Sequence, residues 1–173
     1  PPFFDRSASD SEVLGSIGSV IGHELGHAID DKGSKFNAQG QLVRWMGDID
    51  LEGINGQTAK LRNQLDESKL AGHLKIGEFI GDLVGASFAY QAAFPTKEKE
   101  AKNKKDFFLQ YARVWCEVTR PQYAELLTKT DPHPPGKFRV NGTLVHVKEF
   151  QEAFACKDGS KMTLKEKDRV RIW

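Results

Sequence analysis

Two histidines stand four residues apart in the run HELGH, as His23 and His27. On an α-helix this spacing places both imidazoles on one face, where they can share a metal ion. The chain has five His and twelve Glu in 173 residues, and at these frequencies chance supplies about 0.01 such runs. The run therefore predicts a helix that carries a metal site.

The residue types in this run suit a catalytic zinc ion, which has three protein ligands and keeps a fourth position for water or substrate. His23 and His27 would be two of the ligands. Glu24 follows the first histidine by about 100° around the helix, so its carboxylate can reach the water as a general base without binding the metal. The alternative is an ordinary helix with two hydrogen-bonded histidines and a solvated carboxylate, which requires the whole pattern to be coincidental.

The start of this helix is indicated independently of the histidines. Ser9-Asp10-Ser11-Glu12 has the form of a capping box. Apolar residues follow at helical spacing, namely Val13, Leu14, Ile17, Val20 and Ile21. Each of the helix's glycines should weaken it by about 1 kcal/mol relative to alanine. We therefore expect packing to compensate, with a neighbouring backbone approaching closely at Gly15, Gly18, Gly22 and Gly26.

The residues alone leave the third ligand open. In the metzincin pattern a glycine and a histidine follow the second histidine by three and six residues, but Asp30 and Gly33 stand there instead. A glutamate on a later helix is the remaining common choice. Glu78 and Asp82 would share one helical face in an otherwise apolar run, residues 76–94. Two carboxylates at this spacing usually lie on a solvated helix face. In an apolar run, however, they would be buried and would need partners. His73 is the next candidate for the third ligand.

Further motifs occur in a fixed order along the chain, and through them it resembles the neprilysin and endothelin-converting-enzyme family of zinc metallopeptidases over essentially all 173 residues. They are Pro1-Pro2-Phe3-Phe4, Val20-Ile21-Gly22-His23-Glu24, Asp30-Asp31 with Gly33 and Phe36, Gly77-Glu78 with Asp82, Phe107-Phe108-Leu109, Val114-Trp115-Cys116, Arg120-Pro121-Gln122-Tyr123-Ala124, Thr130-Asp131-Pro132-His133, Phe138-Arg139-Val140, Glu149-Phe150, Ala153-Phe154-Ala155-Cys156 and Trp173.

The resemblance implies a role for several of these residues. Glu78 would be the third zinc ligand, and Asp82 and Asp30 would be carboxylates that orient the ligand histidines, with Asp82 counted in the catalytic set. His133 would stabilise the oxyanion that forms during peptide hydrolysis, and Arg139 would bind a backbone carbonyl of the substrate. Without the resemblance, His133 is a loop residue and Arg139 a surface charge.

The chain also departs from the family pattern. Gly26 replaces a threonine, Phe79 an asparagine and Met46 a second tryptophan, and the stretch from Asp48 to Gly77 is short. Zinc binding should survive these changes, whereas substrate preference cannot be transferred. The family's helical N-terminal lobe and the edge strand that binds substrate backbone have no counterpart here. We therefore expect the C-terminal part of a larger enzyme, with residues 1–173 as a single domain.

Charge and hydropathy exclude other partners. Lys plus Arg is 25 and Asp plus Glu is 24, so the net charge of +1 gives no electrostatic case for nucleic acid or an anionic membrane. No segment has the 18 or so apolar residues of a membrane span, and the start lacks signal-peptide features. Cys116 and Cys156 could form a disulfide, remain thiols or pair with cysteines elsewhere. Their match to family cysteines favours an extracytoplasmic location.

Weaker patterns place the remaining elements. Residues 33–55 read as irregular, 56–70 as a weakly amphipathic helix, and the charged run 97–105 as the solvated beginning of the next helix. Pro121 can open a helix to Lys129, and Asn141-Gly142 predicts a turn. Residues 147–154 and 163–170 are predicted helices.

Together these observations predict a mainly α, thermolysin-like (gluzincin) catalytic domain with one Zn²⁺ per chain. It would hydrolyse bonds within peptides through a zinc-bound water, with Glu24 as base. Two other classes stay open: a zinc-binding module of low activity that needs its N-terminal lobe, and a structural helical domain without metal. The apolar surface that an N-terminal lobe would cover should be exposed and should favour self-association.

Overall fold

The helix that carries the two histidines begins as the sequence predicts. The structure is a computed structural model that describes residues 2–96 and 101–172. Ser9 caps α1 (Asp10–Val13) through a capping box with Glu12. A π-helical segment, Leu14–Gly18, then leads without a break into α2 (Ser19–Gly26). His27 is the C-terminal cap of α2, so both histidines lie in its final turns.

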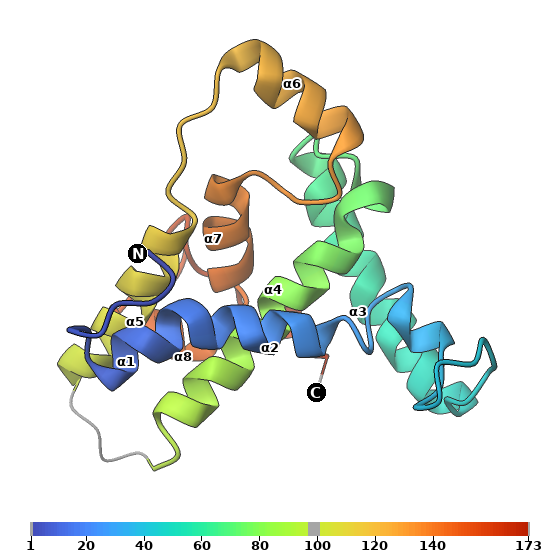
Figure 1. Cartoon of the computed structure of the whole chain (residues 1–173), viewed down its shortest axis with the longest axis horizontal. Helices are drawn as coiled ribbons and strands as arrows, with labels where there is room; N and C mark the ends of the chain where they lie inside the picture. Colours follow the sequence, from blue (N-terminus) through green and yellow to red (C-terminus); the bar gives the residue numbers. More distant parts are fainter. Residues whose placement is uncertain (1, 97–100, 173) are drawn as a thin grey trace.

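Two long helices follow. Helix α3 (Asp48–Glu67) buries Thr58, Leu61 and Leu65, and α4 (Gly72–Ala93) is buried along most of its length. Helix α2 crosses α4 at an angle in the view of Figure 1, and the two helices pack directly against each other. Backbone contact requires small residues there: a Cβ at Gly85 would overlap the carbonyl oxygen of Ser19, and one at Gly81 would lie 2.8 Å from Nδ1 of His23. The close approach of a neighbouring backbone expected before His27 is present at Gly15, Gly22 and Gly26 but not at Gly18, where an added Cβ would meet only the side chain of Leu14. This packing brings the histidines against α4.

The C-terminal half is built from shorter helices. These are α5 (Ala101–Val114), α6 (Pro121–Thr130), α7 (Gly136–Leu144) and α8 (Lys148–Ala153), with 3₁₀ turns at Gly33–Lys35 and Glu166–Asp168. Helix α6 lies at the edge of the molecule, with its last turns near α4, and extended loops connect it to α5 and α7 (Figure 1). Within the described ranges the β structure is limited to one isolated bridge between Phe36 and Leu42. The predicted mainly α class is confirmed.

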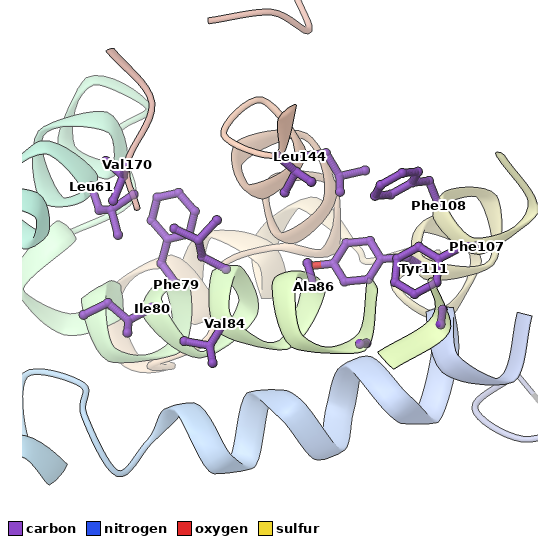
Figure 2. Packing of buried hydrophobic residues seen from close by; sticks show 14 of the residues in the cluster. Leu61, Phe79, Ile80, Val84, Ala86, Phe107, Phe108, Tyr111, Leu144 and Val170 are labelled. Atoms are coloured by element: carbon purple, nitrogen blue, oxygen red, sulfur yellow. The ribbon is translucent and has the colours of Figure 1, made fainter. Parts of the chain in front are cut away.

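A hydrophobic cluster of described residues joins α3, α4, α5, α7 and α8, whereas α6 buries no residue. Figure 2 shows side chains of α5 and α7, among them Phe108, Tyr111 and Leu144, gathered along one side of α4, while Val84 points from α4 toward α2. Phe79 of α4 packs edge-on against Phe138 of α7, with ring centroids 5.0 Å apart. This core fixes α4, and with it Glu78 and Asp82, relative to both α2 and α7.

Three local predictions are wrong. Helix α3 begins at Asp48 rather than at residue 56, because Asp48 and Asp50 favour its N-terminal turn and Gly53 is tolerated inside it. Asn141-Gly142 lies within α7, where Gly142 contacts the ring of Phe138. Residues 163–170 form only a 3₁₀ turn.

Two of the weaker helix predictions are confirmed, by α6 and α8. Of the charged run 97–105, residues 97–100 lie outside the described residues, and α5 follows them.

Candidate metal centre

Helices α2 and α4 bring three metal-ligating side chains together. The imidazoles of His23 and His27 lie edge to face with ring centroids 4.7 Å apart, and Glu78 faces them from α4. One donor atom from each of these three residues lies within 4.8 Å of the other two. In the part of the chain that the structure describes, no other group of three His, Cys, Asp or Glu side chains meets this criterion.

This donor set suits zinc. Catalytic zinc sites commonly use two histidines and a glutamate. The Nε2 atoms of His23 and His27 lie 3.1 Å and 3.8 Å from the carboxylate oxygens of Glu78. Ligands about 2.0–2.2 Å from a tetrahedral zinc stand roughly 3.3 Å from each other, so small side-chain shifts would complete the set. His73, the other candidate ligand, is exposed on α4 and does not belong to the group.

Each ligand histidine has a carboxylate on its second nitrogen. Nδ1 of His23 lies 2.9 Å from Asp82, and Nδ1 of His27 lies 2.8 Å from Asp30. Asp30 also accepts from the backbone N–H groups of Lys32 and Gly33, which fixes its orientation. In this arrangement each histidine can donate from Nδ1 and turns Nε2 toward Glu78, so that Nε2 is the nitrogen that would bind a metal ion once it carries no proton.

Arg139 reaches the same cluster from α7. Its side chain donates from Nε and Nη2 to Asp82, and its guanidinium lies over the ring of Trp115, 3.6 Å from the centroid. Tyr111 donates to the backbone carbonyl of Arg139. Arg139 is therefore a buried partner of Asp82, not the surface charge that its sequence context suggests.

His133 enters from the loop between α6 and α7. Its Nε2 lies 3.2 Å from Oε2 of Glu78, and its Nδ1 lies 2.8 Å from Asp131. The side chain is half exposed. Glu24 is exposed on α2, one residue after His23. The structure thus gathers His23, His27, Glu78, Asp82, Asp30, His133 and Arg139 into one contact network, and Glu24 lies on the helix beside it.

The charges in this network shift two pKa values in opposite directions. Burial lowers the pKa of His23, but hydrogen bonds to Asp82 and Glu78 outweigh burial and raise this pKa from 6.5 to about 9. Burial raises the pKa of Glu78, but the hydrogen bond from His23 and the charge of His133 outweigh it and hold this pKa below its usual value. Without metal, His23 and Glu78 therefore form a charged pair. A metal cation would take the place of the proton between them.

Two residues that support the site have no distinguishing local pattern in the sequence. Lys75 is fully buried beside the His133 loop, and nothing local distinguishes it from a surface lysine. Asp131 belongs to the Thr130-Asp131-Pro132-His133 motif, and an aspartate side chain commonly accepts from the backbone N–H two residues on, as it does here from His133. The cysteines are free: Cys116 is exposed and Cys156 is half-buried.

Comparison with known proteins places this site in a family. The model of peptidase family M13 matches residues 1–170. Human neprilysin is 40% identical over 188 aligned residues, which cover 98% of this chain and 25% of neprilysin. Endothelin-converting enzyme 1 of Bos taurus is 36% identical, with 93% of this chain and 23% of the relative covered. The chain spans about a quarter of the length of these relatives.

Solved structures agree. The inhibitor complex of the zinc metalloprotease Zmp1 of Mycobacterium tuberculosis superposes with a TM-score of 0.92 at 34% identity, covering all of this chain and 29% of Zmp1. PepO of Lactobacillus rhamnosis gives a TM-score of 0.92 at 26% identity, covering 98% of this chain and 28% of PepO. Both the fold and the sequence motifs confirm the resemblance, and the chain belongs to peptidase family M13, a family of zinc metallopeptidases.

Proposed function

We propose that this chain is the zinc-binding catalytic part of a metallopeptidase that hydrolyses peptide bonds within peptides. The observation that carries the proposal is the group of three donors, His23, His27 and Glu78, which would hold one zinc ion. When bound there, zinc would supply Lewis acidity, which polarises a carbonyl and lowers the pKa of a water molecule.

Glu24 would move the protons of this reaction. Its carboxylate is exposed on α2 beside His23, so it is accessible to water and substrate. We assign it the role of general base, which takes a proton from the attacking water onto a carboxylate oxygen and then delivers that proton to the nitrogen of the leaving amine.

His133 and Arg139 would hold the substrate carbonyls. In the imidazolium form, His133 donates from Nδ1 to Asp131 and from Nε2 toward the centre of the site. A carbonyl oxygen that gains negative charge could accept this second hydrogen bond. Arg139 uses Nε and Nη2 on Asp82, and among the described residues Nη1 has no hydrogen bond. Nη1 is therefore the donor that we assign to a substrate backbone carbonyl.

We further propose that residues 1–173 act as one domain that is completed by an N-terminal lobe. The shared hydrophobic cluster of α3, α4, α5 and α7 supports a single unit. On α2, beside the metal centre, Ile21 and Leu25 are 57% and 62% exposed, which is costly for an apolar face unless another surface covers it. The alternative function, a zinc-binding module with weak activity of its own, rests on the same exposure.

Zinc analysis together with a fluorogenic peptide assay tests the proposal. We expect about one zinc per chain, slow cleavage by the isolated chain, loss of cleavage with a chelator and recovery with zinc. Zinc without cleavage would support the interaction module, and a protein that takes up no zinc would contradict both. Sedimentation analysis tests the expected self-association.

An extracytoplasmic location is also a proposal. Cys116 and Cys156 are free within this chain and accessible enough to pair with another segment. Among the described residues, no helix is long and apolar enough to cross a membrane. Non-reducing mass spectrometry of the native protein tests whether the two cysteines form disulfides.

A further inference from the structure

Lys75 is a fully buried lysine that the proposed chemistry does not use. It lies on α4 three residues before Glu78, so the two side chains share a face of that helix. A buried ammonium group is costly unless hydrogen bonds compensate for lost water. Burial lowers the pKa of Lys75, and the negative charge of Asp131 opposes this effect.

Three backbone carbonyls surround the ammonium nitrogen. Nζ of Lys75 lies 3.2 Å from the carbonyl oxygens of Leu127 and His133, and it also donates to the carbonyl of Asp131. An ammonium group has three N–H donors, so every donor has an acceptor. Leu127 lies in the last turns of α6, where carbonyl groups carry the negative end of the helix dipole. Lys75 thus ties α4 to the end of α6 and to the loop that follows.

This loop has few hydrogen-bond donors of its own. Pro132, Pro134 and Pro135 have no backbone N–H. The N–H and Nδ1 of His133 are both within 2.8 Å of Oδ1 of Asp131, which orients the ring relative to the loop. Within residues 2–96 and 101–172, the bonds from Lys75 are the hydrogen bonds that connect the carbonyl groups of Asp131 and His133 to α4, the helix that carries Glu78.

We propose that Lys75 is a positioning residue for His133: its ammonium group fixes the backbone of residues 131–133 to α4 and so sets the place of the His133 imidazole beside Glu78. The inference rests on the proposed role of His133 in peptide hydrolysis. Lys75 itself touches neither metal nor substrate, and it acts only through the loop.

A double-mutant cycle tests this inference with zinc-loaded protein and a peptide substrate. Lys75→Met keeps an unbranched apolar side chain that matches the lysine as far as Cε, and it removes the ammonium group with its three donors. We expect kcat to fall about tenfold to a hundredfold, as for other small misplacements of a reacting group, with KM and zinc content unchanged. His133→Ala should lower kcat by about a hundredfold or more, and adding Lys75→Met to it should cost nothing further. Additive losses, or parental kcat in Lys75→Met, would overturn the inference.

A matched control uses Lys129, an exposed lysine of α6. Lys129→Met makes the same chemical change without touching the loop and should leave kcat unchanged. If Lys75→Met does not fold, Lys75→Gln retains two N–H donors and should give an intermediate loss of kcat. If Lys75→Met does not fold and a folded Lys75→Gln variant has the parental kcat, the result would count against the inference.

A second measurement does not depend on activity. In Lys75→Met we expect faster hydrogen exchange at the His133 amide and a shifted or broadened Cε1–H NMR signal of its imidazole, with unchanged signals from His146. Unchanged exchange and an unchanged His133 signal would overturn the positioning role. If the parent protein shows no peptidase activity, the proposed function fails, and these two signals alone decide the role of Lys75.

Discussion

Arg139 and Asp82 form a buried ion pair, with Nε of Arg139 2.9 Å from Oδ2 of Asp82. The other oxygen of the carboxylate, Oδ1, lies 2.9 Å from Nδ1 of His23. Asp82 therefore serves two partners at once, one on α2 and one on α7. Through this carboxylate, Arg139 would help to orient His23, a proposed metal ligand, in addition to the substrate contact that the family resemblance implies.

Asp82→Asn should lower both the metal affinity and the free energy of unfolding. Removing the charge weakens the orientation of His23, and such changes typically lower metal affinity by about 10-fold to 100-fold. Arg139 would also keep a buried charge without its counter-ion, which typically costs about 3–5 kcal/mol. Competition with a chelator measures the first effect and urea unfolding the second. Asp158→Asn, at an exposed site, is the control; unchanged zinc affinity in Asp82→Asn would contradict the orienting role.

Glu24→Gln should keep zinc and lose peptide hydrolysis. The amide has nearly the same shape as the carboxylate but cannot accept the proton. Zinc content and cleavage of a fluorogenic peptide measure the two properties. Glu52→Gln, an exposed position on α3, should retain both. Cleavage by Glu24→Gln at the parental rate would show that another group is the base.

Glu78→Ala should act on the metal itself. One of the three donors disappears, and His23 and His133 lose the carboxylate that both contact. We expect a sharp fall in zinc affinity, measured by chelator competition at constant pH. Glu52→Ala serves as the matched control. Undiminished zinc content would point to another ligand, although exposed His73 lies outside the donor group.

The parts of the fold that the sequence predicted best depend on local interactions. The capping box at Ser9 and the two histidines of α2 are both local patterns, and each appears in the structure as expected. Among the site residues from later in the chain, the residues alone offer Glu78 and Asp82 as candidates, whereas Asp30, His133 and Arg139 are indicated only by the family resemblance. Their positions depend on the packing of α2, α4 and α7, which no short pattern encodes.

Residues 163–170 show why other predictions failed. Their spacing of polar and apolar residues suits a helix, but the backbone N–H of Val170 donates to Nδ1 of His146, and this bond competes with helix formation. At the candidate site, the position of Lys75 also depends on a contact that is distant in the sequence. A lysine among apolar residues predicts a side chain that reaches solvent, whereas three carbonyl groups from a distant loop stabilise it in the interior.

His146 should make the stability of the fold dependent on pH. Burial, and to a smaller extent the charge of Lys60, lowers the pKa of His146 from 6.5 to about 4. The unfolded chain therefore binds a proton below pH 6.5 that the folded chain does not bind until about pH 4. The contribution of this neutral imidazole is fully present above pH 6.5 and is lost as the pH falls toward 4, by about 3 kcal/mol in total.

Urea unfolding between pH 7 and 4 measures this loss. His146→Gln should have a smaller decline in unfolding free energy over this range than the parent chain. His73→Gln, which changes an exposed histidine of α4, should keep the parental decline. Equal slopes for the parent and His146→Gln would show that other groups cause the acid sensitivity.

Zinc uptake should release a proton from His23. In the metal-free chain the pKa of this imidazole is about 9, so at pH 7.5 both of its nitrogens carry protons, one shared with Asp82 and one with Glu78. A metal ion needs the Nε2 lone pair, and its binding displaces about one proton from His23. The proton on His23 should therefore make the apparent zinc affinity rise by about tenfold per pH unit below pH 9 and level off above it.

Calorimetry in buffers of different ionisation enthalpy counts the protons released. Asp82→Asn removes the partner that raises the pKa most and should release fewer protons at pH 7.5; equal proton release from both proteins would show that the Asp82 contact does not control the charge of His23.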